Sequence, residues 1–519
     1  MPLPEFKNEP LSDFKNNPAH RRRMEYALDE IREELGREYN LVIGGERIKT
    51  QKKFCSYDPS HPDQVVGVFS QADAALADRA VRKADEAFKT WSRTPMQKRV
   101  DLLLKTSKLL LDRKYYYEAR LVYEVGKTWP EADADVAEAI DFIEFYARAV
   151  QRLANPQPLT PVAGEKNHLR YLPLGAGVVI PPWNFPLAIL VGMTMAAVVT
   201  GNTVVLKPSS DAPLIAYKFF EALEETGMPP GVVNFLPGPG GVVGDTLVGH
   251  PRTRFVAFTG SKDVGLHINE LAAKTAPGQI WVKRVIAEMG GKDSIIVDTD
   301  ADLDAAVEGV VVSAFGYQGQ KCSACSRAIV VAPVYDVFLE KLQKRVEQIA
   351  VGPAERLENY MGPIINAQAK KSILEYIEVG ESEGRLITGG SASAGAGHFV
   401  QPTVIADVPP KARIAQEEIF GPVLAVIRAG NFDEALAIAN DTEYGLTGAV
   451  YTQDRRKMEK ATEEFFVGNL YLNRKCTGAL VGAHPFGGFN MSGTDSKAGG
   501  YDYLLLFTQA KAVAERLTT

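Results

Sequence analysis

Residues 175–208 read GAGVVIPPWNFPLAILVGMTMAAVVTGNTVVLKP, and this stretch decides the fold class. A β-rich run, GAGVVIPP, is followed by an apolar run of helix length and by a second β-rich run, NTVVLKP. The β-rich runs lack the alternation of apolar and polar residues expected of a sheet with one solvated face, so their strands should be buried on both faces. The rhythm continues through GVVNFLPG (231–238) and FVAFTG (255–260). The pattern predicts a parallel sheet with helices on both faces.

The flanking segments extend this α/β pattern. A chain of 519 residues is too long for one hydrophobic core, so two or three domains are expected. Before the deciding stretch, the sequence predicts a helix over 21–35, a hairpin over 39–50 that turns at Gly44-Gly45, and helices over 72–150 that break near 127–130. After it, strands are expected at 293–298, 327–333 and 422–430, and a late strand within 503–517.

The composition excludes several classes of protein. The net charge is −6 with both signs interspersed, which argues against a nucleic acid or an anionic membrane surface as the main partner. The longest apolar run, from Leu187, is shorter than the roughly 18 residues of a membrane helix, and residues 1–18 lack the apolar core of a secretory signal. Four cysteines are too few for a disulfide framework. We therefore expect a cytoplasmic protein without a membrane segment.

A lone C-x-x-C at Cys322 and Cys325 has two possible interpretations. It could be a redox pair or half of a zinc site, but no second C-x-x-C exists and the seven histidines are scattered. We therefore expect no metal.

Three strand ends carry features of a nucleotide site. Residues 238–244 read GPGGVVG, whose last glycine comes one position later than in the G-x-G-x-x-G fingerprint, so a plain glycine-rich loop is the better interpretation of this segment taken alone. The strand 255–258 runs into Thr259 and Ser261 at a helix N-terminus, which favours an anion, although an ordinary serine N-cap gives the same pattern. Lys207 ends a strand at the sheet edge where ligands bind, although it could also be solvated. Together these features favour a nucleotide.

Cys322 is the candidate nucleophile, within FGYQGQKCSACSR (315–327). Glycines and small polar residues around it indicate a tight loop. Lys321 and Arg327 would lower the pKa of the thiol if they point toward it. The alternative is a small cysteine buried in the core.

Glu288 is the candidate base. A cysteine hydrolase would use a histidine, and only His484 lies in a glycine-rich setting. Glu288 lies between apolar residues and Gly290-Gly291, so desolvation would raise its pKa toward the useful range. A glutamate at the solvated end of a helix is the alternative.

Seven motifs occur together and in order: PWNFP, LKPS, FTGS, EMGGK, GQKCSA, EEIFGPV and PFGGFNMSG. As a set, from about residue 40 to the C-terminus, they resemble the aldehyde dehydrogenase superfamily. The resemblance implies an α/β fold with three parts. These are a Rossmann-like NAD(P)-binding domain with N-terminal helices (1–155 and 176–286), a catalytic α/β domain (287–472), and a small β oligomerisation extension with the C-terminal tail (156–175 and 473–519).

Within the superfamily, three segments resemble the branch that oxidises L-glutamate γ-semialdehyde, which is in equilibrium with 1-pyrroline-5-carboxylate, to L-glutamate. The segments are ADVAEAIDF (134–142), FGYQGQKCSACSR, and NRKCTGALVGAHPFGGFNMSGTDSKAGG (473–500). The resemblance implies a role for each matching residue. Cys322 would be the nucleophile, Glu288 the base for deacylation, and Asn184 a donor to the oxyanion. The implied cofactor-binding residues are Trp183, Lys207, Ser210, Gly241, Thr259, Gly260, Ser261, Glu418 and Phe420. The implied substrate-binding residues are Glu138, Phe185, Ser323, Gly478, Ala479 and Phe486.

The resemblance also implies a cofactor and partners. Many relatives that prefer NAD carry a glutamate where this chain has Ser210, and serine would not repel a 2′-phosphate, so we expect NAD to work and NADP to be tolerated. The implied partners are a small-molecule substrate and further copies of the chain, as a dimer or an assembly of dimers. If Cys325 reaches Cys322, oxidation could join the two and silence the enzyme.

Other functions stay open at this stage. One is an aldehyde dehydrogenase for another small semialdehyde, such as succinic semialdehyde. Another is a member without catalysis, kept for binding or structure, and a third is a cysteine hydrolase.

Overall fold

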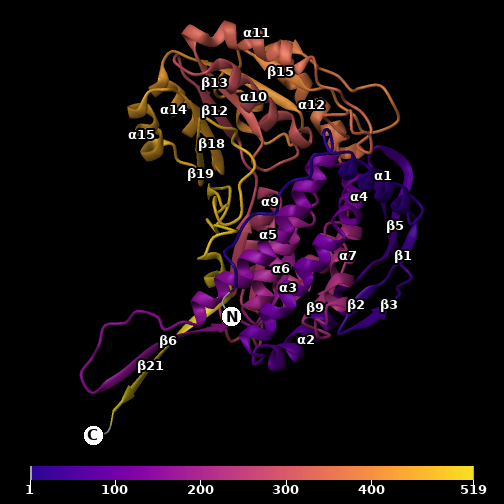
Figure 1. The fold of residues 1–519 in the computed structure, drawn as a ribbon, viewed down its shortest axis with the longest axis vertical. Helices are drawn as coiled ribbons and strands as arrows, with labels where there is room; N and C mark the ends of the chain where they lie inside the picture. Colours follow the sequence, from indigo (N-terminus) through magenta and orange to yellow (C-terminus); the bar gives the residue numbers. More distant parts are fainter. Residues whose placement is uncertain (1–2, 518–519) are drawn as a thin grey trace.

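The computed structural model describes residues 3–517 and places them in two lobes, each built around a seven-stranded sheet (Figure 1). A two-stranded arm projects from the lobe formed by the N-terminal half of the chain. The two predicted α/β series therefore form separate sheets.

The first sheet has the strand order β11-β10-β7-β8-β9-β2-β3. The pairings from β11 to β9 are parallel, which confirms the parallel sheet predicted from the deciding stretch. The strands are β7 (Ala176–Ile180), β8 (Thr203–Leu206), β9 (Val233–Phe235), β10 (Phe255–Thr259) and β11 (Arg284–Glu288). One face is covered by α3 (Met96–Asp112), α5 (Trp129–Ala154), α6 (Ala188–Val199) and α7 (Pro213–Glu225), and the other by α2 (Ala74–Trp91), α8 (Asp245–Gly249) and α9 (Lys262–Ala273). Burial on both faces explains why the strands are apolar throughout.

The predicted hairpin is present and extends this sheet. It consists of β2 (Leu41–Ile43) and β3 (Glu46–Ile48), and both turn glycines have positive φ, 63° at Gly44 and 85° at Gly45. Because β2 pairs antiparallel with β9, the hairpin forms one edge of the sheet. The sequence pattern predicted the hairpin but not this position.

The remaining N-terminal elements pack around the first lobe. Helix α1 (Pro18–Arg32) begins earlier than the expected residue 21, because the Asn17 side chain caps it by accepting from the Ala19 N–H and Pro18 occupies its first turn. Helix α4 (Lys114–Val125) ends at Gly126, where the chain breaks before α5 as predicted. The strands β1 (Arg37–Tyr39), β4 (Lys53–Asp58) and β5 (His61–Ser70) form a separate three-stranded sheet.

The second sheet has the order β14-β15-β16-β13-β12-β18-β19 and is parallel except at its β14 edge. Its strands are β12 (Asp293–Val297), β13 (Cys325–Val331), β14 (Arg385–Thr388), β15 (Thr403–Ala406), β16 (Val423–Ala429), β18 (Thr447–Tyr451) and β19 (Asn469–Leu472). Helices α10 (Leu303–Phe315) and α11 (Tyr335–Val346) cover one face. Helices α12 (Ala367–Glu383), α13 (Arg413–Gln416), α14 (Phe432–Asn440) and α15 (Arg455–Glu464) lie on the other side.

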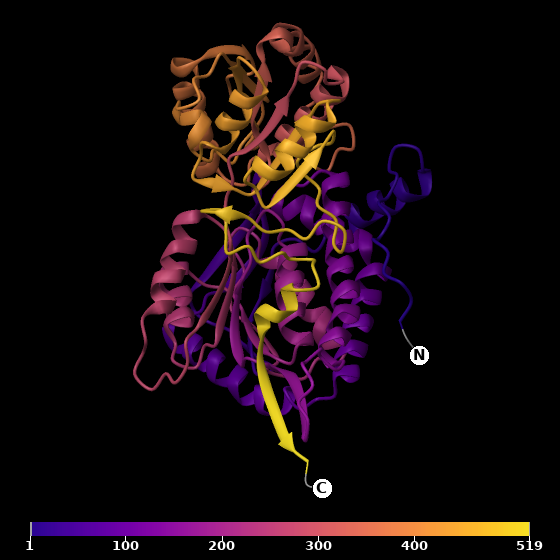
Figure 2. The ribbon, with the colours of Figure 1, turned by 90° about the vertical axis from the view of Figure 1, so that its left-hand side faces the viewer.

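The arm is an antiparallel pair of β6 (Glu165–Pro173) and β21 (Thr508–Arg516), so the expected late strand is present. Residues 473–507 are not part of the arm. They run from the second lobe across the first lobe before the chain enters β21 (Figure 2), and on the way β20 (Phe489–Asn490) pairs with β17 (Tyr444–Gly445). Within residues 3–517, no helix has the length and apolarity that a membrane crossing requires.

Candidate active site

A cavity of about 480 Å³ opens where β7, β8 and β10 end, and both lobes contribute to its wall. The sequence-predicted residues that line it are Trp183, Asn184, Lys207, Ser210, Thr259, Gly260, Ser261, Cys322, Glu418 and Phe420. Gly241 is not part of the wall of this cavity: it is exposed in a turn at 240–244, and its assignment to the cofactor site stays a prediction. The fold thus brings one predicted set of residues from separate motifs to a single cavity.

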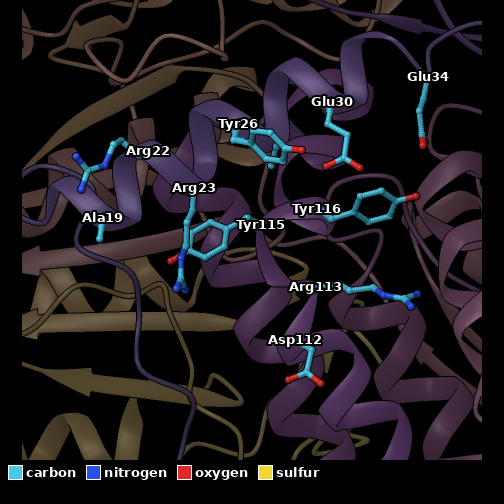
Figure 3. Close-up of a pocket in the computed structure, with 11 residues that line it drawn as sticks. Ala19, Arg22, Arg23, Tyr26, Glu30, Glu34, Asp112, Arg113, Tyr115 and Tyr116 are labelled. Carbon is cyan, nitrogen blue, oxygen red and sulfur yellow. The ribbon is translucent and has the colours of Figure 1, made fainter.

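A larger hollow of about 800 Å³ lies between α1 and α4 (Figure 3). Its wall includes Arg22, Tyr26, Glu30 and Tyr115, and it contains none of the residues that the sequence singled out. We place the candidate site in the smaller cavity, because that cavity gathers a thiol, the half-buried carboxylate of Glu418 and a buried lysine.

Cys322 lies in a tight loop between α10 and β13. The loop begins with a left-handed turn, with φ of 49° at Tyr317, 57° at Gln318 and 68° at Gly319. Left-handed backbone is costly for residues other than glycine and persists where surrounding contacts hold it. Here the Tyr317 hydroxyl donates to the Val125 carbonyl at 2.9 Å.

Asn184 is held beside the same loop. Its Nδ2 donates to the Gln320 carbonyl at 3.0 Å. Gln320 is itself anchored, because its side-chain oxygen accepts from the Ile365 N–H at 2.9 Å. The first of these hydrogen bonds fixes the Asn184 amide beside Gln320, which precedes Cys322 by two positions in the chain. An oxyanion that forms at Cys322 needs a donor at such a place.

The surroundings of Cys322 raise the pKa of its thiol. Burial is the main cause, and the carboxylates of Asp293, Glu418 and Glu288 further disfavour the thiolate. The expectation that Lys321 and Arg327 lower this pKa is wrong. The Lys321 ammonium pairs instead with Glu131 at 2.7 Å, and the Arg327 guanidinium donates to the carbonyls of Lys292, Ile438 and Ala439. The thiol must therefore lose its proton to a base.

The structure does not support a pair between Cys325 and Cys322. Cys325 begins β13 and its side chain is buried in the core of the second lobe. Its Sγ donates to the Arg327 carbonyl at 3.4 Å, and the same core contains Cys476. All four cysteines of the chain are free.

Glu288 is the last residue of β11, and segment 488–496 holds both of its carboxylate oxygens. Oε1 accepts from the Ser496 hydroxyl at 2.6 Å and from the Ser496 N–H at 3.2 Å, while Oε2 accepts from the Gly488 N–H at 3.0 Å. Burial raises the pKa of Glu288 to about 7, and these hydrogen bonds limit the rise. A carboxylate that titrates near neutral pH suits a general base.

Glu418 contributes a half-buried carboxylate to the cavity. Its Oε1 accepts from the Gly291 N–H at 3.2 Å, and burial raises the pKa of its carboxyl to about 7. Next to it, the Phe420 ring meets the Trp183 ring edge-on at 5.5 Å. The two rings form an apolar part of the cavity wall.

Lys207 and Ser261 lie at the end of the cavity formed by the first sheet. Lys207 follows β8; its ammonium is buried, which lowers its pKa to about 8, and among residues 3–517 its one acceptor is the Pro208 carbonyl, at 3.3 Å. Ser261 is the N-cap residue of α9, yet its side chain makes no capping hydrogen bond. A buried cation and a free hydroxyl at a helix N-terminus suit an anionic ligand with hydroxyl groups, such as a dinucleotide.

The predicted substrate residues do not line this cavity, and two of them, Ser323 and Phe185, belong to the Cys322 loop or lie beside it. Ser323 follows the nucleophile, and its carbonyl accepts from the Cys476 Sγ at 3.5 Å, which brings the loop of Gly478 and Ala479 alongside. The Phe185 ring lies 6.5 Å from the ring of Tyr317. In the same C-terminal segment, the backbone of Phe486 pairs with that of Ala498.

The sequence reasoning named Glu138 but missed the other acidic residues of a charge cluster on α5. Glu131 pairs with Lys321, the residue before the nucleophile. One turn later, Asp135 accepts from the Ala188 N–H at 2.7 Å at the start of α6 and pairs with Lys127 at 3.0 Å, and neither side chain of that pair is exposed. The pKa of Glu138, one turn further along, rises to about 8 through burial. The signal that could have revealed this cluster is acidic residues spaced by one turn on a largely apolar helix.

Similar proteins are known for nearly the whole chain. A 1-pyrroline-5-carboxylate dehydrogenase of Geobacillus sp. (strain WCH70) is 57% identical over 510 residues, which cover 98% of this chain and 99% of that protein. A 1-pyrroline-5-carboxylate dehydrogenase 1 of Halalkalibacterium halodurans is 54% identical over 513 residues, 99% of each chain.

Solved structures agree with these relatives. A 1-pyrroline-5-carboxylate dehydrogenase from Thermus with bound NAD superposes with a TM-score of 0.98 at 55% identity, covering 99% of this chain and 100% of the other. A betaine aldehyde dehydrogenase from Staphylococcus aureus in complex with NAD+ gives 0.89 at 28% identity, covering 95% and 98%. The model of the Aldehyde dehydrogenase family matches residues 47–513, so this chain belongs to the aldehyde dehydrogenase family.

Proposed function

We propose that this enzyme oxidises L-glutamate γ-semialdehyde, the open form of 1-pyrroline-5-carboxylate, to L-glutamate with NAD. The observation that carries the proposal is that Cys322, Asn184 and Glu418 share a cavity with Lys207 and Ser261. The names of the relatives support the substrate, and the bound NAD in the Thermus relative supports the cofactor. Such a step belongs to the breakdown of proline or arginine.

The cavity fits a dinucleotide. Lys207 would hold the adenosine ribose, Ser261 would meet the pyrophosphate, and Glu418 would hold the nicotinamide ribose, with Phe420 beside it. NAD, when bound, supplies the acceptor for the two electrons that leave the aldehyde carbon. Ser210 lines the cavity and carries no charge, so we propose that NADP is tolerated.

The chemistry starts at Cys322. Its thiol loses a proton to Glu288, which releases that proton to solvent before the second half of the reaction, and its sulfur attacks the aldehyde carbon, which leaves an oxyanion near the Asn184 amide. After the carbon is oxidised, a thioester remains on Cys322. Glu288 then removes a proton from water, which attacks the thioester and releases the acid. The balance is one aldehyde, one NAD+ and one water consumed, with one acid, one NADH and one proton formed.

We propose that the substrate-binding part of the active site lies around the Cys322 loop. Ser323 and the N–H groups of Gly478 and Ala479 would bind the α-carboxylate. Phe185 and Phe486 would contact the aliphatic carbons, and Glu138 would lie near the amino group.

The test is the absorbance of NADH at 340 nm with purified protein, NAD and 1-pyrroline-5-carboxylate, beside succinic semialdehyde and the Cys322→Ala variant. Reduction of NAD with pyrroline carboxylate that is lost in the variant is expected. Reduction with succinic semialdehyde alone would keep the mechanism and refute the substrate.

We further propose that the protein is a homo-oligomer, a dimer or an assembly of dimers, joined through the β6–β21 arm. The arm projects from its own lobe and most of β21 is exposed, so it has backbone and side chains available for another copy (Figure 1). Four free thiols suit a reducing compartment, for which we propose the cytoplasm. Light scattering during gel filtration tests the assembly.

A further inference from the structure

The loop at 474–480 forms a wall beside the nucleophile. The Cys476 N–H donates to the Ser313 hydroxyl at 3.2 Å, and the Cys476 Sγ donates to the Ser323 carbonyl at 3.5 Å. Ser323 directly follows Cys322. The position of the loop relative to the reacting thiol is therefore set by two buried contacts of Cys476.

This loop presents unused donors. Gly478 has a φ of 74°, and its carbonyl accepts from the Arg474 guanidinium at 3.1 Å. The N–H groups of Gly478 and Ala479 donate to no acceptor among residues 3–517. Two successive free N–H groups at a left-handed turn suit an anion.

Lys475 adds a charge to these donors. Its ammonium nitrogen lies 3.3 Å from the point where a side chain on Gly478 would begin. Within the described chain, Lys475 makes no hydrogen bond and no ion pair; its half-buried position and nearby Lys321 both lower the pKa of the ammonium. A partly desolvated cation without a partner is unfavourable unless a ligand compensates it.

The nearest acidic group does not supply that compensation. Glu131 lies close enough to influence Lys475, but its carboxylate already pairs with the Lys321 ammonium, at 2.7 Å. Two lysines therefore face one glutamate, which leaves one positive charge beside the Gly478 and Ala479 amides. The loop offers a carboxylate both directional donors and a full charge.

We propose that Lys475 binds the α-carboxylate of the aldehyde substrate and selects anionic aldehydes over neutral aldehydes of the same length. This assignment rests on the proposed function and adds a residue that determines specificity. The side chain acts on binding alone, because its role requires no contact with the reacting carbon. Its loss should therefore raise KM much more than it lowers kcat.

The experiment compares Lys475→Met and Lys475→Arg with the wild type, using NAD with 1-pyrroline-5-carboxylate and with pentanal. Lys89→Met, at an exposed position on α2, is the matched control. Lys475→Met should raise KM for pyrroline carboxylate by about tenfold or more, while kcat/KM for pentanal should change by no more than about twofold. Lys475→Arg keeps the charge and should recover most of the loss.

Equal losses with both aldehydes, or no change with either, would overturn the role of Lys475. The alkylation rate of Cys322 by iodoacetamide separates these outcomes from misfolding, because a disturbed loop would change that rate in Lys475→Met. If the wild type oxidises succinic semialdehyde but not pyrroline carboxylate, the proposed function fails. The same KM comparison, made with succinic semialdehyde and with pentanal, then tests the role of Lys475 independently of the proposed function.

Discussion

Replacing Ser496 with alanine should raise the pKa of Glu288 and slow turnover mainly at low pH. The Ser496 hydroxyl donates to Glu288 Oε1 at 2.6 Å, whereas the N–H groups of Ser496 and Gly488 remain in the variant. Only the hydroxyl contact is lost. Because that contact stabilises the charged carboxylate, its removal shifts the pKa upward.

The size of the shift follows from the strength of the lost contact. A hydrogen bond to a charged group contributes about 1.5–3 kcal/mol, and one pKa unit corresponds to about 1.4 kcal/mol. The pKa of Glu288 should therefore rise from about 7 by at least about one unit. At pH 7 the ionised fraction would fall from about one half to about one tenth, so the rate should drop about fivefold. Well above the new pKa the two enzymes should converge.

The assay is the pH dependence of kcat for Ser496→Ala, with Ser496→Thr as the variant that keeps the hydroxyl. Since Glu288 acts as a base, activity rises with pH through its pKa, and the acid limb of the alanine profile should move to higher pH. A profile that falls by the same factor at every pH would mean that Ser496 only supports the fold. An acid limb that does not move would refute the assignment of Glu288 as the titrating base.

Three further predictions follow from other contacts. Asp135→Ala leaves the Lys127 ammonium buried and unpaired, so the free energy of unfolding should fall by about 3–5 kcal/mol. A urea titration measures this change. A fall below about 1 kcal/mol would show that the pair is not important for stability. Ser210→Glu places a carboxylate in the cofactor cavity, and a carboxylate repels a 2′-phosphate. The kcat/KM for NADP should therefore fall by about tenfold or more relative to that for NAD. An unchanged ratio of the two kcat/KM values would mean that the adenosine ribose does not lie beside Ser210. A chain that ends at Phe507 lacks β21 and should have a smaller mass by light scattering, and an unchanged mass would exclude the arm from assembly.

The sequence predicted the elements and many members of the site. Apolar β-rich runs without alternation can be buried only between two layers of helices, so the parallel sheets were predictable from local pattern. The strand ends of one sheet were also predictable as a ligand site: Lys207 and Ser261 share a cavity, because the carboxyl ends of parallel strands lie along one edge of a sheet. Cys322 reaches the same cavity from the loop before β13 in the other lobe.

The tertiary structure decided the electrostatics and the supporting contacts. The pKa of Cys322 is raised mainly by burial and further by carboxylates that come from distant parts of the chain. Lys321, which precedes Cys322, pairs with Glu131, 190 positions earlier in the chain. Likewise, Ser496 reaches Glu288 only because segment 473–507 crosses between the lobes. Local sequence determines which residues form a strand or a loop. The charge that surrounds a side chain depends on residues brought together from distant segments, and only the folded chain specifies those neighbours.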